Sequence, residues 1–138
     1  MKLLNEIQQK LKAPKNQRNN FGNYNYRSCE DILEAVKPLL GKATLVLYDE
    51  VVCIGDRNYV KASAELKEGD GTVKVSAYAC ESTDQKGMAP AQMTGSASSY
   101  ARKYALNGLF LIDDQKDADT MDNSTPKKEF IQSNGGIF

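Results

Sequence analysis

Apolar residues recur with helical spacing near the N-terminus of the chain and again after a polar segment. The first stretch predicts a helix over about residues 2–12, and the second predicts a helix over about residues 28–40. Ser28 is a typical N-cap residue, and Asp31 stands three residues later, where it can complete a capping box. Pro38 is expected to kink or tighten the last turn of this second helix.

The middle of the chain alternates between apolar and polar residues with the period of a β-strand. We predict three strands, over about residues 44–54, 59–67 and 72–79. The alternation leaves one face of the last two strands apolar and the other polar and partly basic. Lys61 and Lys74 on this polar face are candidates for contacting an anion, and the alternative is a solvated surface with cross-strand ion pairs.

A long helix is predicted over about residues 91–107, closed by Gly108. At 100° per residue its side chains separate into two arcs. The apolar arc contains Met93, Ala97, Tyr100, Ala101, Tyr104 and Ala105. The polar arc contains Ser96, Ser98, Ser99, Arg102, Lys103 and Asn107, with Leu106 as the one exception. The pattern as a whole predicts an α+β fold, in which helices flank a three-stranded antiparallel sheet that is followed by this helix.

Composition and charge fit one domain of 138 residues. Lys plus Arg equals Asp plus Glu at 18 each, which excludes a globally polycationic protein but leaves room for a local basic groove. Residues 1–20 carry five basic side chains against one acidic, and residues 111–125 carry five acidic against one basic. We therefore expect a folded domain over residues 1–112 and a flexible, acidic then polar tail over residues 113–138.

Several classes of protein are excluded by what the sequence lacks. It has no His, which removes Ser-His-Asp hydrolases and His-metal centres. Cys29, Cys53 and Cys80 form no CxxC pair, so we expect reduced thiols and no metal or cofactor. The N-terminus is too polar for a signal peptide, and no apolar run is long enough to cross a membrane. These features predict a soluble, cytoplasmic protein.

The polar arc of the last helix is the first candidate binding surface. Ser98, Ser99, Arg102 and Lys103 come together on it, and two adjacent cations beside hydroxyl groups can bind successive phosphates. The alternative is that the cations near the end of the helix only complement its dipole.

The segment of residues 15–27 is the second candidate. It has no apolar period and interleaves aromatic with basic residues, so we expect an irregular loop. Tyr24, Tyr26 and Arg27 suit single-stranded nucleic acid, because unstacked bases bind to aromatic faces while cations follow the phosphates. The alternative is that the two tyrosines are aromatic residues at the edge of the core.

Two enzymatic interpretations are weaker. Glu65 and Lys67 form an E-x-K pattern of the kind found in metal-dependent nucleases, with Asp49 or Asp56 as further carboxylates.

No G-x-x-x-x-G-K-[ST] motif occurs, which argues against ATP use. The acidic residues between Asp113 and Asp119 lack the spacing of a calcium loop and are expected to be solvated.

One stretch is specific enough to indicate a family. The segment Met93–Phe110, followed by Ile112-Asp113-Asp114 and by Lys116-Asp117-Ala118-Asp119, resembles the signature of the Erf family of phage single-strand annealing proteins. Tyr24-Asn25-Tyr26-Arg27 is similar to the N-terminal pattern of that family. The resemblance covers roughly residues 1–120.

The resemblance implies a non-enzymatic protein that binds single-stranded DNA, anneals complementary strands without ATP and assembles into rings or filaments during phage recombination. It implies a β-β-β-α core and a DNA-binding basic pair at Arg102 and Lys103, with Tyr26 and Arg27 as further candidates. It places the protein in the bacterial cytoplasm, with a host or phage single-strand binding protein as a further candidate partner. The terminal Ile137-Phe138 resembles the partner-recruiting tails of such proteins, although the acidic run directly before it is missing.

Overall fold

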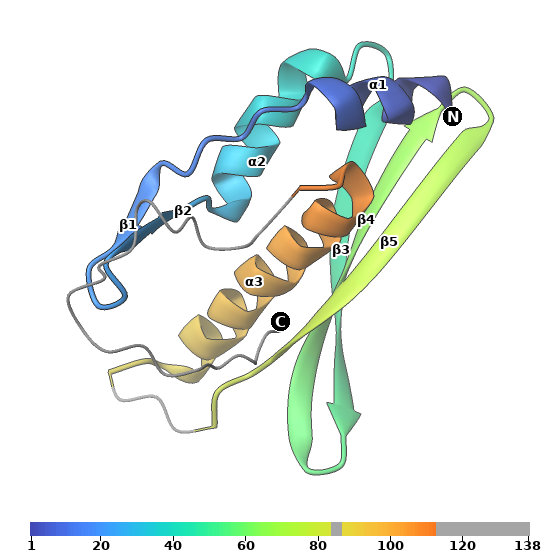
Figure 1. Ribbon diagram of the computed structural model, residues 1–138. Coiled ribbons are helices and arrows are strands. Elements are labelled where there is room, and N and C mark those ends of the chain that lie inside the picture. The colour runs from blue at the N-terminus through green and yellow to red at the C-terminus, as the bar shows by residue number, and fades with distance from the viewer. Residues whose placement is uncertain (84–86, 113–138) are drawn as a thin grey trace.

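The computed structural model describes residues 1–83 and 87–112. They form an α+β fold, as predicted, with a small hairpin, a three-stranded sheet and helices before and after that sheet in the sequence (Figure 1). The elements are α1 (Lys2–Lys10), β1 (Gln17–Asn19), β2 (Tyr24–Tyr26), α2 (Cys29–Val36), a 3-10 helix (Lys37–Leu39), β3 (Thr44–Ile54), β4 (Arg57–Glu68), β5 (Gly71–Cys80) and α3 (Pro90–Phe110). The predicted tail lies outside the described residues.

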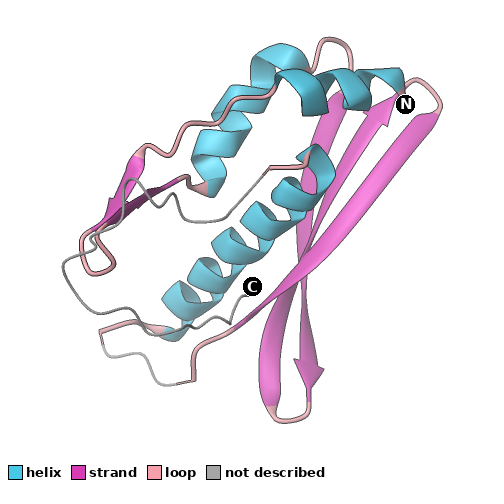
Figure 2. Ribbon diagram, in the orientation of Figure 1, coloured by secondary structure: helices cyan, strands magenta, loops and turns pink. Residues whose placement is uncertain are grey.

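The large sheet is antiparallel with the order β3-β4-β5, and its register confirms the predicted alternation. The apolar side chains of β4 all lie on one face and are fully or almost fully buried: Val60, Ala62, Ala64 and Leu66. The helices gather on that side of the sheet (Figure 2). No described helix covers the opposite face, where Val46, Tyr48 and Tyr78 are exposed.

Helix α3 packs along β4 and β5 through small residues. Ala97, Ala101 and Ala105 are buried, because their short side chains let the helix approach the sheet closely. Gly108 serves the same purpose: a Cβ atom there would lie 3.1 Å from a methyl carbon of Val75. Gly108 is therefore a packing residue inside the helix, and the prediction that it closes the helix is wrong.

The helix ends one turn later. Its last residues, Leu109 and Phe110, are buried in the main core, and burial of these large side chains favours continuing the helix past the glycine. Leu111 then ends it with a left-handed φ of 57°. Among the described residues, no helix has both the length and the apolar character that a membrane crossing requires.

The N-terminal helices close the other end of the core. Ile7 of α1, Ile32 of α2 and Phe110 of α3 are each almost completely buried in one cluster. The predicted capping box of α2 is confirmed, because the Ser28 hydroxyl accepts a hydrogen bond from the Asp31 backbone and the Asp31 carboxylate accepts one from the Ser28 backbone. The 3-10 turn that contains the proline follows directly, as expected.

The segment between α1 and α2 is not the irregular loop that its composition suggested. It forms the β1–β2 hairpin, in which Arg18 pairs with Asn25. The Asn19 side chain accepts hydrogen bonds from the backbone amides of Phe21 and Gly22, and Asn23 adopts a positive φ of 54°. A Cβ atom on Gly22 would collide with the ring of Tyr24. With only three residues in each strand, the hairpin has too short an apolar period to be recognised.

Candidate nucleic-acid interface

Arg102 and Lys103 are neighbours in the sequence but point to different sides of α3. Successive side chains of an α-helix are rotated by about 100°, so these two side chains leave the helix in different directions. Arg102 reaches toward β3, and Lys103 reaches toward β2 at the other side of the helix. We call these the Arg102 side and the Lys103 side.

On the Arg102 side, the carboxylate of Asp49 binds two of the predicted contact residues, Arg102 and Ser98. Asp49 accepts a hydrogen bond from Nε of Arg102 at 3.0 Å and a second from the hydroxyl of Ser98. The pair is only partly buried, with 35% of the arginine side chain and 23% of the aspartate side chain exposed. The Arg102 side is therefore already charge-paired in this structure.

Asp49 is a site residue that the sequence analysis considered only as a possible metal ligand. Its register partner on β4 is the buried Ala62, so its side chain lies on the helix-covered face of the sheet. A signal was present, because Leu45 and Leu47 precede it with the same parity. A charge on the apolar face of a strand requires a partner on the element that covers it.

On the Lys103 side, the lysine is buried, with 8% of its surface exposed. Its ammonium lies 5.4 Å from the ring centre of Tyr26, within the range of a cation–π contact. The rings of Tyr24 and Tyr26 are 6.2 Å apart. The hairpin thus brings Tyr26 close to the predicted lysine, with Tyr24 beside Tyr26.

This arrangement corrects the predicted arcs of α3. Lys103 was assigned to the polar arc and is buried, whereas Tyr100 was assigned to the apolar arc and is 53% exposed. Leu106, the exception in the polar arc, is fully buried. The buried face is rotated toward Leu106, and the aliphatic stem of a lysine can pack against apolar groups there.

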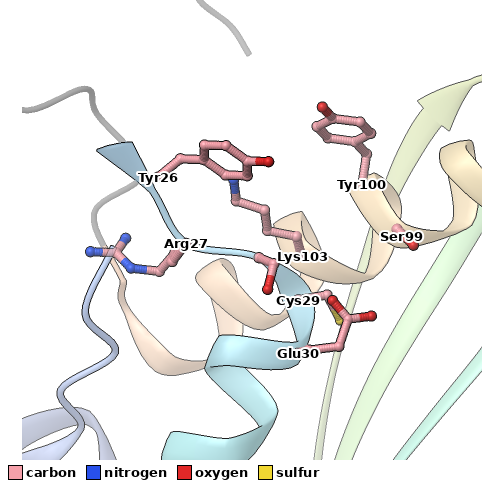
Figure 3. A pocket seen from close by; sticks show the side chains of 8 residues that line it. Tyr26, Arg27, Cys29, Glu30, Ser99, Tyr100 and Lys103 are labelled. Atoms are coloured by element: carbon pink, nitrogen blue, oxygen red, sulfur yellow. The ribbon is translucent and has the colours of Figure 1, made fainter. Parts of the chain in front are cut away.

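A pocket of about 180 Å³ lies on the Lys103 side between β2, α2 and α3. Figure 3 shows Tyr26 and Tyr100 on separate sides of it, with the side chain of Lys103 extending to the Tyr26 ring. We call it the tyrosine pocket, and its lining comprises Tyr26, Arg27, Ser28, Cys29, Glu30, Ser99, Tyr100 and Lys103. Four of these were predicted as DNA-binding residues: Tyr26, Arg27, Ser99 and Lys103.

The charges around the tyrosine pocket are mixed. Nε of Arg27 donates a hydrogen bond to the Ala13 carbonyl at 2.7 Å, which holds the arginine at the pocket edge. The exposed Glu30 adds a negative charge. Burial, followed by the nearby Glu30 carboxylate, raises the pKa of the Cys29 thiol, so the thiol stays protonated at neutral pH.

Lys61 and Lys74 are not part of this group. Both lie on the uncovered face of the large sheet, where Lys61 stands 6.0 Å above the ring of Tyr78 and Lys74 is the register partner of Glu65. The predicted site residues therefore form two groups on different faces of the sheet, and the Arg102 and Lys103 sides hold the larger one.

The carboxylates of the nuclease interpretation do not converge. Glu65 lies on the uncovered face of the sheet, whereas Asp49 lies on the covered face and is bound to Arg102. Within residues 1–83 and 87–112, no three acidic or cysteine side chains are grouped to hold a metal ion. The acidic segment from Asp113 to Asp119 lies outside the described residues.

Comparison with known proteins agrees with the resemblance inferred from the helix motif. Residues 1–134 match the ERF superfamily. The chain is 58% identical over 131 residues to the "Essential recombination function protein" of Salmonella phage P22, an alignment that covers 91% of this chain and 64% of that protein. The chain thus spans slightly less than two thirds of the length of this relative. No solved structure matches it. Because the family match extends over nearly the whole sequence, the chain belongs to the ERF superfamily.

Proposed function

We propose that this chain binds single-stranded DNA and anneals complementary strands without ATP, as a phage-encoded recombination protein in the bacterial cytoplasm. The observation that carries the proposal is the tyrosine pocket, which joins Lys103 to two tyrosines in a chain of the ERF superfamily. Cations that follow the phosphates and aromatic rings that stack on bases are the two ingredients of sequence-independent single-strand binding. The binding domain is residues 1–112.

The proposed mechanism uses binding energy only. Lys103 and Arg102 neutralise phosphates of the strand, which reduces the repulsion between two complementary strands. Bases outside the pocket stay accessible and sample pairings until a stable duplex forms. No bond is broken, so neither a nucleotide cofactor nor a metal ion takes part.

A continuous DNA surface requires several subunits. Two edges of the large sheet, β3 and β5, have no strand partner among the described residues. Unpaired edges of 11 and 10 residues are suited to join neighbouring copies. Such head-to-tail contacts close into rings or extend into filaments. We propose one of these assemblies, with a single-strand binding protein as a further partner.

Annealing of fluorescently labelled complementary oligonucleotides, measured in EDTA and without ATP, tests the proposal. The protein is expected to accelerate annealing well above the spontaneous rate. An unchanged rate would overturn the proposal. Incubation of labelled DNA with Mg²⁺ or Mn²⁺ tests the nuclease alternative through Glu65 and Lys67, and intact DNA is the expected result.

A further inference from the structure

We infer that the tyrosine pocket holds one base of the bound DNA strand, with the flanking phosphates outside it. This inference rests on the proposed function and adds a specific contact to it. It concerns the residues that line the Lys103 side and assigns no part to Asp49 or Ser98.

The volume of the pocket supports a single base. At about 180 Å³ it is smaller than the cavities of several hundred Å³ that enclose drug-sized ligands. A planar ring system of one base is the part of a nucleotide strand that such a space admits. The sugar and phosphate then remain at the open side.

The exposed ring of Tyr100 supplies the stacking surface. It is 53% exposed, so it is accessible to a ligand at the mouth of the pocket. It lies 6.2 Å from the ring of Tyr104 at a tilt of 39°, so a neighbouring aromatic side chain supports it. Tyr26 forms a separate side of the pocket. A base between them gains stacking without any need for a particular sequence.

The charges of the pocket favour a base over a phosphate. The Lys103 ammonium lies 5.4 Å from the centre of the Tyr26 ring and lines the pocket, where it can contact a phosphate that flanks the bound base. The carboxylate of Glu30 lines the same pocket and repels a phosphate placed inside it. A neutral, polar ring therefore fits better than an anion.

The test combines a protein substitution with a change in the DNA. Binding is measured for oligo(dT) and for an abasic oligonucleotide of equal length, with the wild-type protein and the variants Tyr100→Ala and Tyr100→Phe. Tyr100→Phe is the matched control, because it removes only the hydroxyl group. The abasic strand reports whether each variant still binds the backbone.

We expect Tyr100→Ala to lose about ten-fold in affinity for oligo(dT), in the range of one stacked base, and little for the abasic strand. Tyr100→Phe keeps the ring and is expected to stay within about two-fold of the wild type for both strands.

Equal losses of Tyr100→Ala on both strands would overturn the inference, as would an unchanged affinity for oligo(dT). In either case binding by the wild type would leave the proposed function standing. If the wild type bound neither strand, the proposed function itself would fail. The two failures are therefore distinguishable.

Discussion

The two sides of α3 carry neighbouring cations in different chemical settings. On the Arg102 side, a carboxylate from β3 pairs with the guanidinium and with Ser98. On the Lys103 side, the ammonium lies against an aromatic ring at the base of a pocket. Residues that look equivalent in the sequence therefore contribute differently: Arg102 can bind a phosphate only in competition with Asp49, whereas Lys103 acts next to stacking surfaces.

The largest expected effect is on the Lys103 side. Lys103→Met keeps an unbranched side chain that fills the same space but removes the charge. We expect affinity for single-stranded DNA to fall about ten-fold, as for the loss of a charged hydrogen-bonding group. Lys42→Met removes the same charge at an exposed position before β3 and serves as the control. Fluorescence anisotropy measures both, and equal affinities of the two variants would contradict the role of Lys103.

A second prediction concerns helix α2, whose first turn lines the tyrosine pocket. Ser28→Ala removes the hydroxyl that caps α2, the helix whose first turn lines the pocket. We expect the free energy of unfolding to fall by about 1 kcal/mol, the usual contribution of such a cap. Urea denaturation measures this change. An unchanged midpoint and slope would show that the cap contributes nothing to stability.

The Arg102 side is expected to respond in the opposite direction. Asp49→Asn removes the charge that competes with DNA for Arg102, so affinity should rise about three-fold, within the small range of a partly exposed ion pair. Asp70→Asn makes the same chemical change in the exposed turn between β4 and β5. A lower affinity of Asp49→Asn than of Asp70→Asn would mean that Asp49 positions Arg102 for binding instead of competing for it.

The smallest effect is a pH dependence of stability from the same cap. Partial burial alone would raise the pKa of Asp31, but hydrogen bonds from Ser28 and Gln17 and the charge of Arg27 together hold the pKa below its ordinary value. A carboxyl with a lowered pKa stabilises the fold above the ordinary aspartate value of about 4 and loses this contribution as the pH falls below it. Between pH 5 and pH 3, the urea midpoint of the wild type should therefore fall more than the urea midpoint of Asp31→Asn. Equal falls would contradict this assignment.

The sequence predicted the strand faces and the start of α2 correctly. The alternation of β4 and the capping box of α2 depend on local patterns, and both are confirmed. The β1–β2 hairpin was not predicted, because its strands are short and its turn depends on hydrogen bonds that the Asn19 side chain accepts. The end of α3 was misjudged because Gly108 reads locally as a stop, while its contact with Val75 is visible only in three dimensions.

The sequence identified several residues of the candidate site but not how they are placed. Residue type identified Tyr26, Arg27 and the two cations, but helical periodicity could not place Lys103 in the interior, because it counts a lysine as polar along its whole length. Nor could it pair Arg102 with Asp49, which lies 53 residues away. Both facts depend on how the sheet and the hairpin pack against α3.

The salt dependence of single-strand binding shows whether Arg102 and Lys103 contact the phosphates of the strand. Dissociation constants for oligo(dT) are measured over a series of salt concentrations for the wild type and for Arg102→Ala/Lys103→Ala, with circular dichroism as the control for folding. We expect the affinity of the wild type to weaken steeply with salt. We expect the double variant to show a lower affinity and a logarithmic slope smaller by about 1.4, for two lost phosphate contacts. A folded double variant with the affinity and slope of the wild type would contradict this expectation.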